Sequence, residues 1–214
     1  MVQNMKNQSV KELVYEGILN DILQGVYPPN AILNERMLIE KYEVSKTPVR
    51  EALVQLCSEG ILKNIPRFGY QLPVITPAEI NDIIEYRMML ECAALEKTIK
   101  IITNDEIDAL VNHATSAVKL SQQKDVTVHW ETNMEFHIML CSYCRNQFVE
   151  KALQDALKFC CRVATQYFNN TWEKKKLADS SGHKKLVEAI RSRNLELARE
   201  LLIEDINCMR DEIM

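Results

Sequence analysis

Apolar residues recur at the spacing of an α-helix along most of this chain. In residues 9–24, SVKELVYEGILNDILQ, one side of such a helix collects Val10, Leu13, Val14, Ile18, Ile22 and Leu23. Gly25 follows as a stop signal. A second, shorter helix is predicted for ERMLIEKY at residues 35–42, with Asn34 as its N-cap. The chain therefore begins with two short helices separated by a loop.

The stretch VSKTPVREAL, residues 44–53, predicts the start of a third helix. Ser45 or Thr47 can accept hydrogen bonds from the free N–H groups of its first turn, and Pro48 suits that turn because no N–H partner is needed there. The exposed beginning of this helix carries four polar side chains: Ser45, Lys46, Thr47 and Arg50. Hydroxyls, free N–H groups and two cations at a helix N-terminus suit phosphate oxygens and guanine edges.

A basic hairpin is predicted directly after the third helix. Residues 61–75, ILKNIPRFGYQLPVI, indicate two short strands around the turn PRFG, with Arg67 at the tip. Two short helices, a tight turn before polar residues and a basic hairpin form the pattern of a winged helix-turn-helix. An ordinary helical subdomain with a capped helix would have the same spacing, so the pattern alone leaves DNA binding open.

The remainder of the chain is nearly free of helix-breaking residues. After Pro77 there is no proline, and Gly182 is the only glycine. This shift in composition places a domain boundary near residues 72–76. We therefore expect two domains, at residues 1–74 and 75–214.

Long helices are predicted for the second domain. Capping boxes at Thr76–Glu79 and Thr103–Glu106 begin two of them. Four more are expected at about 125–142, 146–169, 172–192 and 194–212. An antiparallel bundle of about six to seven helices can bury a core of its own. The predicted fold is mainly α: a winged helix-turn-helix of three helices and a small β-hairpin, followed by this bundle.

The distribution of charge does not exclude a nucleic-acid partner. The 214 residues carry a formal net charge of −4. Up to residue 74, eight Lys and Arg balance eight Asp and Glu, whereas the rest has 18 basic against 22 acidic residues. An evenly charged first domain can still carry a local basic patch.

Cysteine content and the length of apolar runs indicate in which cellular compartment the protein is found. Cys141 and Cys144 form C-x-x-C, but no second C-x-x-C completes a zinc ribbon. In a helical region we expect these thiols to pack as small apolar groups rather than to bind metal or act in redox chemistry. Seven cysteines fit a reducing cytosol. With no signal-peptide pattern and no apolar run of the roughly 20 residues that a membrane helix needs, a cytoplasmic protein without membrane contact is expected.

Four polar residues of the second domain have the chemistry of metal ligands. Asn133 and His137 are four residues apart and share one helical face. His183 begins an apolar helical pattern, and Asp205 follows 22 residues later. Two imidazoles, a carboxylate and an amide oxygen can hold a first-row divalent ion with positions left open. The alternative is two histidines on amphipathic faces and a solvated aspartate, because spacing cannot show that three helices converge.

Several motifs of the first domain occur together in one known family. They are I-L-x-G from residue 22, L-N-E-R at 33–36, V-S-K-T-P-V-R-E-A-L at 44–53 and E-G-I at 59–61. With them, the segment resembles the winged helix of GntR-type bacterial transcription regulators. The resemblance implies a homodimer that binds a pseudo-palindromic DNA operator. It aligns seven residues with DNA-contacting positions of the family: Arg36, Lys46, Thr47, Arg50, Arg67, Phe68 and Gly69.

The first domain departs from the family pattern at three positions. Asn30 and Glu43 stand where glycine is usual, and Lys46 stands where arginine is frequent. Asparagine tolerates a left-handed backbone, so the change at residue 30 is mild. Lysine keeps the charge but lacks the bidentate fork of arginine, and we expect weaker base discrimination there.

The bundle resembles the FCD effector domain of the FadR subfamily. The matching segments are E-Y-R-M-M-L-E-C-A-A at 85–94, N-M-E-F-H at 133–137 with the following Asn146, and His183 with A-R-E-L-L-I-E-D at 198–205. In metal-binding members the ligands correspond to Asn133, His137, His183 and Asp205. Here an asparagine replaces the family's aspartate and Asp205 replaces its last histidine. Two alternatives stay open: one divalent ion per chain (Zn, Mn or Ni) as a cofactor, or a metal-free pocket whose residues hydrogen-bond an effector directly.

Two arginines are candidates for binding an effector. Arg87 lies in an otherwise apolar helix, where an arginine is unfavourable unless it meets an anion. The resemblance places this region in the effector cavity, whose usual ligands are small organic acids, and a carboxylate would pair with Arg87 bidentately. An internal pair with Glu91, four residues later, is the alternative. Arg162 is a second candidate.

The expected function is regulation of transcription. The resemblance implies a repressor whose operator affinity is controlled by a small organic acid, with a divalent metal as a further ligand. A DNA-binding dimer whose bundle serves dimerisation only is the alternative. An enzyme is not expected: a di-iron bundle needs Glu-x-x-His ligands, and none of the four histidines has Glu three residues before it.

Overall fold

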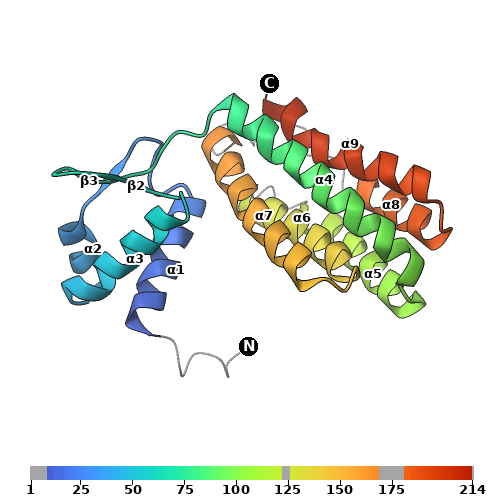
Figure 1. Ribbon diagram of the computed structural model, residues 1–214, viewed down its shortest axis with the longest axis horizontal. Helices are drawn as coiled ribbons and strands as arrows, with labels where there is room; N and C mark the ends of the chain where they lie inside the picture. The colour runs from blue at the N-terminus through green and yellow to red at the C-terminus, as the bar shows by residue number, and fades with distance from the viewer. Residues whose placement is uncertain (1–8, 122–125, 169–180, 214) are drawn as a thin grey trace. The chain divides into compact units, whose positions relative to one another are not determined.

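The computed structural model describes residues 9–121, 126–168 and 181–213. The chain divides into two compact units, Met1–Ile75 and Thr76–Met214. Within the described residues, three helices and three strands form the first unit, and six helices form the second (Figure 1). None of these described helices combines the length and the apolar character needed to span a bilayer.

Three helices surround the core of the first unit. They are α1 (Val10–Leu23), α2 (Glu35–Tyr42) and α3 (Lys46–Ser58), and α3 packs against both others. The predicted N-cap of α2 is confirmed, because the side chain of Asn34 accepts a hydrogen bond from the Met37 amide at 2.8 Å. The core consists of apolar side chains from all three helices, among them Ile18, Leu38, Leu53 and Leu56.

A small antiparallel sheet completes the first unit. The predicted hairpin is present as β2 (Lys63–Ile65) and β3 (Gly69–Gln71). A third strand, β1 (Ile32–Leu33), pairs with the other side of β3 and gives the order β1-β3-β2. The sequence analysis missed β1 because two residues carry no periodicity from which a strand can be recognised. The hairpin is therefore anchored to the loop between α1 and α2.

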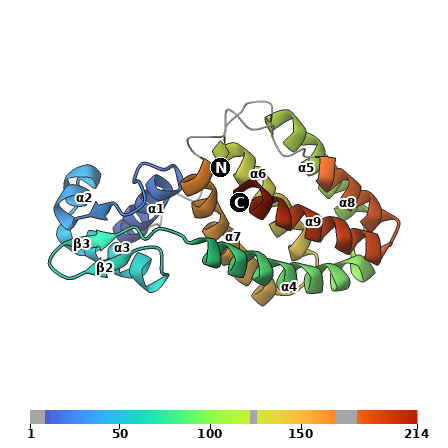
Figure 2. The ribbon, with the colours of Figure 1, turned by 90° about the horizontal axis from the view of Figure 1, so that it is seen from above.

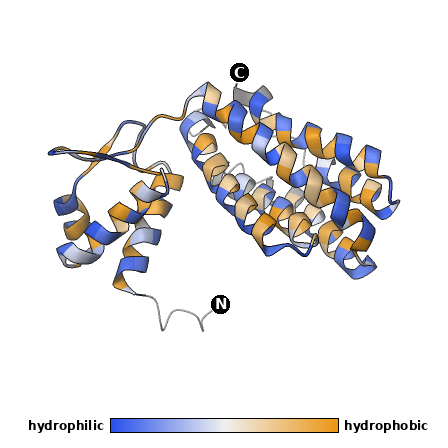
Figure 3. Ribbon diagram, viewed as in Figure 1, coloured by the Kyte–Doolittle hydropathy of each residue, from blue (hydrophilic) through white to orange (hydrophobic). Residues whose placement is uncertain are grey.

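The second unit is a helical bundle. Its helices are α4 (Pro77–Ile101), α5 (Asn104–Ser121), α6 (Val126–Ser142), α7 (Gln147–Phe168), α8 (Ser181–Arg191) and α9 (Leu195–Ile213). Helix α4 packs against α6, α7 and α9, while α5 packs against α6 and α8. Figures 1 and 2 show α4 and α9 side by side. Apolar and polar segments alternate along these helices (Figure 3), as the helical period requires.

Most predicted helix ends of the bundle are confirmed. Both capping boxes form: Glu79 with Thr76, and Glu106 with Thr103. The helix predicted for 172–192 is observed from Ser181 only, since residues 169–180 lie outside the described part of the chain.

The C-x-x-C segment packs in the core. Cys141 and Cys144 are buried in one cluster with Ala94, Leu153 and Leu157. Burial raises the pKa of Cys141 to about 12, with Cys144 adding to the shift, so the thiol stays protonated. The expectation of cysteines acting as small apolar groups is consistent with this packing.

One arginine closes the C-terminal end of α4. Arg193 lies between α8 and α9 with φ of 57°, and its guanidinium donates to the carbonyl oxygens of Ile99 and Ile102 at 2.5 and 2.7 Å. Carbonyl groups in the last turn of a helix have no partner within the helix. Arg193 therefore supplies donors that the end of α4 lacks.

Candidate functional site

The outer face of α3 presents polar side chains to solvent. The opposite face is buried through Val49, Ala52, Leu53 and Leu56. Helical geometry then leaves the remaining positions exposed, including Lys46, Thr47, Arg50 and Val54. Burial of one stripe of the sequence thus orients the residues that the sequence analysis assigned to DNA.

The beginning of α3 differs from the prediction in its capping. Ser45 occupies the N-cap position with an extended backbone, but its side chain makes no capping hydrogen bond, and Thr47 lies inside the helix. Pro48 is the third helical residue, within the predicted first turn. The first-turn N–H groups therefore lack the side-chain acceptor that was expected. Such groups, at the positive end of the helix dipole, can bind phosphate.

The two cations of α3 share one carboxylate on α2. Lys46 Nζ lies 3.2 Å from Glu35 Oε2, and Arg50 Nε lies 3.9 Å from Glu35 Oε1. Both cationic side chains are 67% exposed. Surface pairs of this kind contribute about 0–1 kcal/mol. A phosphate or a base edge can therefore replace Glu35 as their partner with little loss.

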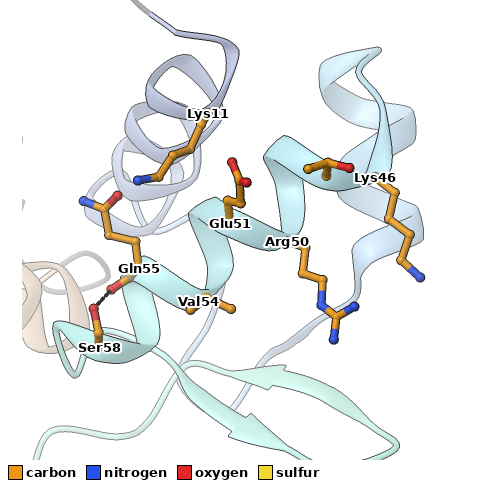
Figure 4. A pocket seen from close by; sticks show the side chains of 8 residues that line it. Lys11, Lys46, Arg50, Glu51, Val54, Gln55 and Ser58 are labelled. Atoms are coloured by element: carbon orange, nitrogen blue, oxygen red, sulfur yellow. Dashed lines mark hydrogen bonds between the residues drawn. The ribbon is translucent and has the colours of Figure 1, made fainter.

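An open cavity of about 820 Å³ lies along the exposed face of α3. Lys46, Thr47 and Arg50 line it together with Lys11 of α1. Figure 4 shows Lys11 extending from α1 toward Gln55, while Lys46 and Arg50 project from the other side of α3. Lys11 was not among the predicted site residues, because nothing in the sequence indicates that the start of α1 lies beside α3.

Two residues of the hairpin tip have positive φ. Arg67 has φ of 71° and Gly69 has φ of 131°. A Cβ at Gly69 would lie 2.6 Å from the Leu33 carbonyl oxygen, so only glycine fits there. Phe68 is 71% exposed. The tip therefore presents Arg67 and Phe68 to solvent on a turn next to β1.

Arg36 lies on the exposed side of α2. Its side chain is 90% exposed and its Nε lies 2.9 Å from Glu40 Oε1. This pair between positions four apart on one helix is screened by solvent. Arg36 is therefore available to an external anion, as the alignment with DNA-contacting positions implies.

Two departures from the family pattern fall on left-handed backbone. Asn30 has φ of 67°, and Glu43, the C-cap of α2, has φ of 54° and ψ of 40°. Glycine adopts this conformation without strain, and asparagine tolerates it. A residue such as glutamate is strained there by about 1 kcal/mol or more. The structure thus explains why glycine is usual at both positions.

A second candidate site lies inside the bundle. His137 of α6, His183 of α8 and Asp205 of α9 bring their donor atoms within 4.8 Å of one another. His137 Nε2 lies 2.9 Å from Asp205 Oδ2, and His183 Nε2 lies 3.4 Å from Asp205 Oδ1. The histidines are 1% and 5% exposed, and the Asp205 side chain is 20% exposed. This convergence argues against the alternative of two histidines on amphipathic faces and a solvated aspartate.

Glu91 contacts the ring of His137, although no helical spacing in the sequence relates the two residues. His137 Nδ1 lies 2.5 Å from Glu91 Oε2 of α4, across 46 positions of sequence. Burial disfavours a charge on His137, but Glu91 and Asp205 outweigh it and raise the pKa of His137 to about 9. Burial would also raise the pKa of Asp205, yet its contacts with the two imidazoles hold that pKa well below its usual range.

His183 is held by its neighbours' rings. The Phe136 ring stacks on His183 with centroids 3.8 Å apart and an interplanar angle of 11°. His137 meets His183 edge-on, at 5.6 Å and 83°. Within the described residues, both ring nitrogens of His183 and Nε2 of His137 are buried without a partner in hydrogen-bond geometry. The two Nε2 atoms thus meet the Asp205 carboxylate at 2.9 and 3.4 Å, and His183 Nδ1 is left for another ligand.

The donor set fits a divalent metal ion. Imidazole nitrogens and carboxylate oxygens ligate first-row divalent ions at about 2.0–2.2 Å, so three donors spaced within a few ångströms can surround one ion. Asn133 lies one turn before His137 on α6 and is half-buried, which keeps it as the fourth candidate ligand. Two of these four residues differ from the pattern of metal-binding relatives, yet His137, His183 and Asp205 converge.

The two candidate effector arginines are both buried. Arg87 is 1% exposed, and its Nε donates to Glu91 Oε1 at 2.8 Å, so the internal pair is present. Arg162 of α7 is 7% exposed, and its guanidinium lies 5.6 Å from the Phe159 ring centroid. Burial lowers the pKa of Arg162, while nearby Glu79 opposes that shift. Among the described residues, Arg87 Nη2 and Arg162 Nε have no hydrogen-bond partner.

Comparison with known proteins agrees with this two-part organisation. The family model for bacterial regulatory proteins of the gntR family matches residues 10–71, and the FCD domain model matches residues 82–207. The first range contains the helix-turn-helix with its hairpin, and the second contains most of the bundle with its buried polar cluster.

Similar proteins are regulators. An uncharacterized HTH-type transcriptional regulator of Bacillus subtilis, YdhC, is 24% identical over 197 residues, which is 90% of this chain and 86% of that protein. The gluconate operon transcriptional repressor of Bacillus subtilis is 31% identical over 115 residues, 54% of this chain and 44% of the repressor.

A solved structure shares the fold. That of E. coli McbR/YncC superposes with a TM-score of 0.80 at 18% identity, covering 97% of this chain and 98% of that one. The relatives and the family are transcription regulators rather than enzymes. The chain belongs to the GntR family of bacterial transcription regulators, with an FCD domain following its helix-turn-helix, an arrangement that fits the FadR-type subfamily.

Proposed function

We propose that this regulator is a homodimeric repressor whose affinity for a pseudo-palindromic operator falls when a small organic acid binds its FCD domain. The observation that carries the proposal is the exposed N-terminal end of α3, where the side chains of Lys46 and Arg50 are 67% exposed and both face the carboxylate of Glu35. This end combines two cations with uncapped N–H groups. That combination suits a phosphate backbone next to base edges.

Each DNA contact has a role that follows from its chemistry. Arg50 can place a bidentate fork on guanine, and Lys46 supplies a point charge to a phosphate. Ser45 and Thr47 offer hydroxyls at the same helix end. Arg67, with its neighbours Phe68 and Gly69 on the hairpin, lies along the backbone as a wing. Arg36 adds a phosphate contact from α2.

A dimer follows from the geometry of operators. Helix-turn-helix proteins bind two half-sites about 34–36 Å apart, one recognition helix for each. One chain carries one α3 helix. A second copy supplies the other, and a small change in the FCD domains then alters how well both helices match the two half-sites.

The effector is proposed to be anionic. Arg87 Nη2 and Arg162 Nε are buried without partners among the described residues, and a buried cationic donor is stabilised by a carboxylate. One relative is named as the repressor of a gluconate operon, and gluconate is an organic acid. These observations favour a small organic acid over a neutral ligand.

A divalent ion is proposed to be held by His137, His183 and Asp205, with Asn133 as a fourth ligand. These residues offer imidazole nitrogens, a carboxylate and an amide oxygen, which suit Zn, Mn or Ni. When bound, the ion would act as a Lewis acid that binds the carboxylate of an effector.

Selection of duplexes from a random DNA library by the full-length protein tests the repressor proposal. We expect enrichment of two inverted half-sites whose centres are about one helical turn apart. Enrichment of a single half-site would contradict the dimer, and no enrichment at moderate salt would contradict operator binding.

Metal content tests the second part of the proposal. The protein is purified without chelator or His tag and analysed by elemental mass spectrometry, and we expect about one ion per chain, lost in His137→Ala. No metal after soaking in zinc, manganese or nickel would contradict the site and favour direct hydrogen bonding of the effector.

A panel of organic acids that raises the melting temperature supports effector binding. No shift with any acid favours a bundle that only dimerises.

A further inference from the structure

Glu91 uses both of its carboxylate oxygens inside the bundle. Oε1 accepts from Arg87 Nε at 2.8 Å, and Oε2 lies 2.5 Å from His137 Nδ1. The side chains of Glu91, Arg87 and His137 are 3%, 2% and 0% exposed. A buried carboxylate with two short contacts of this kind is fixed in place. Its position on α4 therefore determines what the ring of His137 on α6 can do.

The contact with Glu91 assigns the two nitrogens of His137 to different tasks. A carboxylate accepts hydrogen bonds, so Nδ1 carries a proton toward Glu91. The opposite nitrogen, Nε2, is then the atom that lies 2.9 Å from Asp205 Oδ2 without hydrogen-bond geometry. In metal sites the second nitrogen of a ligating histidine commonly donates to a carboxylate, which fixes the tautomer and the ring orientation.

Arg87 offsets the cost of burying the negative charge of Glu91. Glu91 and Asp205 approach His137 from opposite sides of the ring. Without Arg87, the buried charge of Glu91 would face only the titratable ring of His137. The Nε contact of Arg87 neutralises it one helical turn away on α4. Arg87 and Glu91 therefore form a neutral unit that can be exchanged as a whole.

We propose that Glu91 is the positioning residue of the metal site: it holds the proton on His137 Nδ1, so that Nε2 is presented to a divalent cation beside His183 and Asp205. Arg87 balances the charge of Glu91 and does not touch the ion. This inference rests on the metal part of the proposed function. It assigns to α4 a part in metal binding, although α4 contributes none of the ligands.

Zinc affinity of three folded proteins tests the proposal. The wild type, Arg87→Met/Glu91→Met and Arg87→Met/Glu91→Gln are stripped of metal and titrated with Zn²⁺ by calorimetry. The two double variants carry the same charge and differ only in the acceptor opposite His137 Nδ1. Exchange of a buried ion pair for apolar residues is often neutral for stability, and circular dichroism checks that each variant is folded.

We expect Arg87→Met/Glu91→Met to bind zinc about 10–100-fold more weakly than the wild type, as is typical for loss of such a partner. Arg87→Met/Glu91→Gln should recover part of that loss, because its amide oxygen still accepts from Nδ1–H. Equal zinc affinity of both double variants, whether as tight as the wild type or weaker, would overturn the proposal. A wild type that takes up no zinc would remove the metal site itself and leave the DNA-binding proposal untouched.

Histidine NMR of the zinc-loaded wild type gives an answer that needs no variant. The chain has four histidines, so ¹⁵N labelling of histidine alone gives a simple long-range spectrum. We expect His137 to keep its proton on Nδ1 and to bind the ion through Nε2. The reverse assignment would overturn the proposal even if a double variant failed to fold.

Discussion

The two units of this regulator place their charged side chains in opposite environments. On α3, Lys46 and Arg50 are two-thirds exposed and share the carboxylate of Glu35. Inside the bundle, the side chains of Arg87 and Glu91 are 2% and 3% exposed and hold each other at 2.8 Å. Exposed pairs are weak and exchange readily for an external partner. Buried charges are tolerable only with a fixed partner. One unit therefore keeps its charges open to an external polyanion, as the proposed operator binding requires, and the other keeps its charges paired in the interior.

Breaking the buried pair should have the largest effect. Arg87→Met leaves the Glu91 carboxylate buried without its cation, and we expect the unfolding free energy of the bundle to fall by about 3–5 kcal/mol. Chemical denaturation of the full chain measures it. Arg36→Met is the matched control, because this side chain is 90% exposed and forms a solvent-exposed pair with Glu40; the unfolding free energy of this variant should stay near the wild-type value. Equal loss in both variants would show that burial is not what distinguishes the two arginines.

Removal of the recognition arginine should leave the fold intact and weaken DNA binding. Arg50→Ala deletes the proposed guanine contact, which corresponds to about 1–3 kcal/mol, or roughly 5–150-fold in affinity for the selected operator. Fluorescence anisotropy at one fixed salt concentration measures the affinity, and circular dichroism monitors the fold. Unchanged affinity at moderate salt would contradict the assignment of α3 as the recognition helix.

The wing should contribute to DNA binding through the charge of Arg67 alone. Arg67→Ala removes one proposed phosphate contact, so we expect weaker binding to all duplexes and a salt slope shallower by about one. Titrations of operator and of unrelated DNA over a range of salt concentrations measure both quantities. A slope that stays the same would mean that Arg67 does not touch the phosphate backbone.

The smallest effect is expected at the left-handed end of α2. Glu43→Gly relieves the strain at φ of 54°, and we expect a gain of about 0.5–1 kcal/mol in unfolding free energy. Asn30→Gly is the comparison, since asparagine tolerates φ of 67° and should gain less. Thermal unfolding of both variants measures the difference. A larger gain at Asn30 would reverse the explanation given for these two positions.

The sequence predicted the helix-turn-helix unit far more completely than the helical bundle. Asn34 caps α2 as predicted, and helical spacing together with burial of Val49 and Leu53 orients Lys46 and Arg50 on α3. The hairpin around Arg67 was also expected. The capping hydrogen bond expected of Ser45 is absent, and Pro48, the third helical residue, has no N–H to donate to it. β1 was missed because its pairing with β3 depends on residues outside the motif. Lys11 was not predicted as a site residue because its position beside α3 depends on how α1 packs.

In the bundle, the sequence could supply candidates but not their arrangement. His137, His183 and Asp205 have suitable chemistry, yet their meeting depends on how α6, α8 and α9 pack. The sequence left two partners open for Arg87, an external carboxylate or Glu91, and the structure shows the pair with Glu91 in the buried part of α4. No pattern connected Glu91 with His137, because the 46 positions between them correspond to no helical period.

Sequence by itself determined the family, the helical periods, the two-part organisation and the polar end of α3, because these depend on residues close together in the chain. The tertiary structure alone decided that two histidines and an aspartate share one buried place, that Glu91 orients one of them, and that Arg87 faces inward. The reason is physical: the partners of a buried charge are chosen by helix packing, whereas an exposed charge needs only a helix to present it.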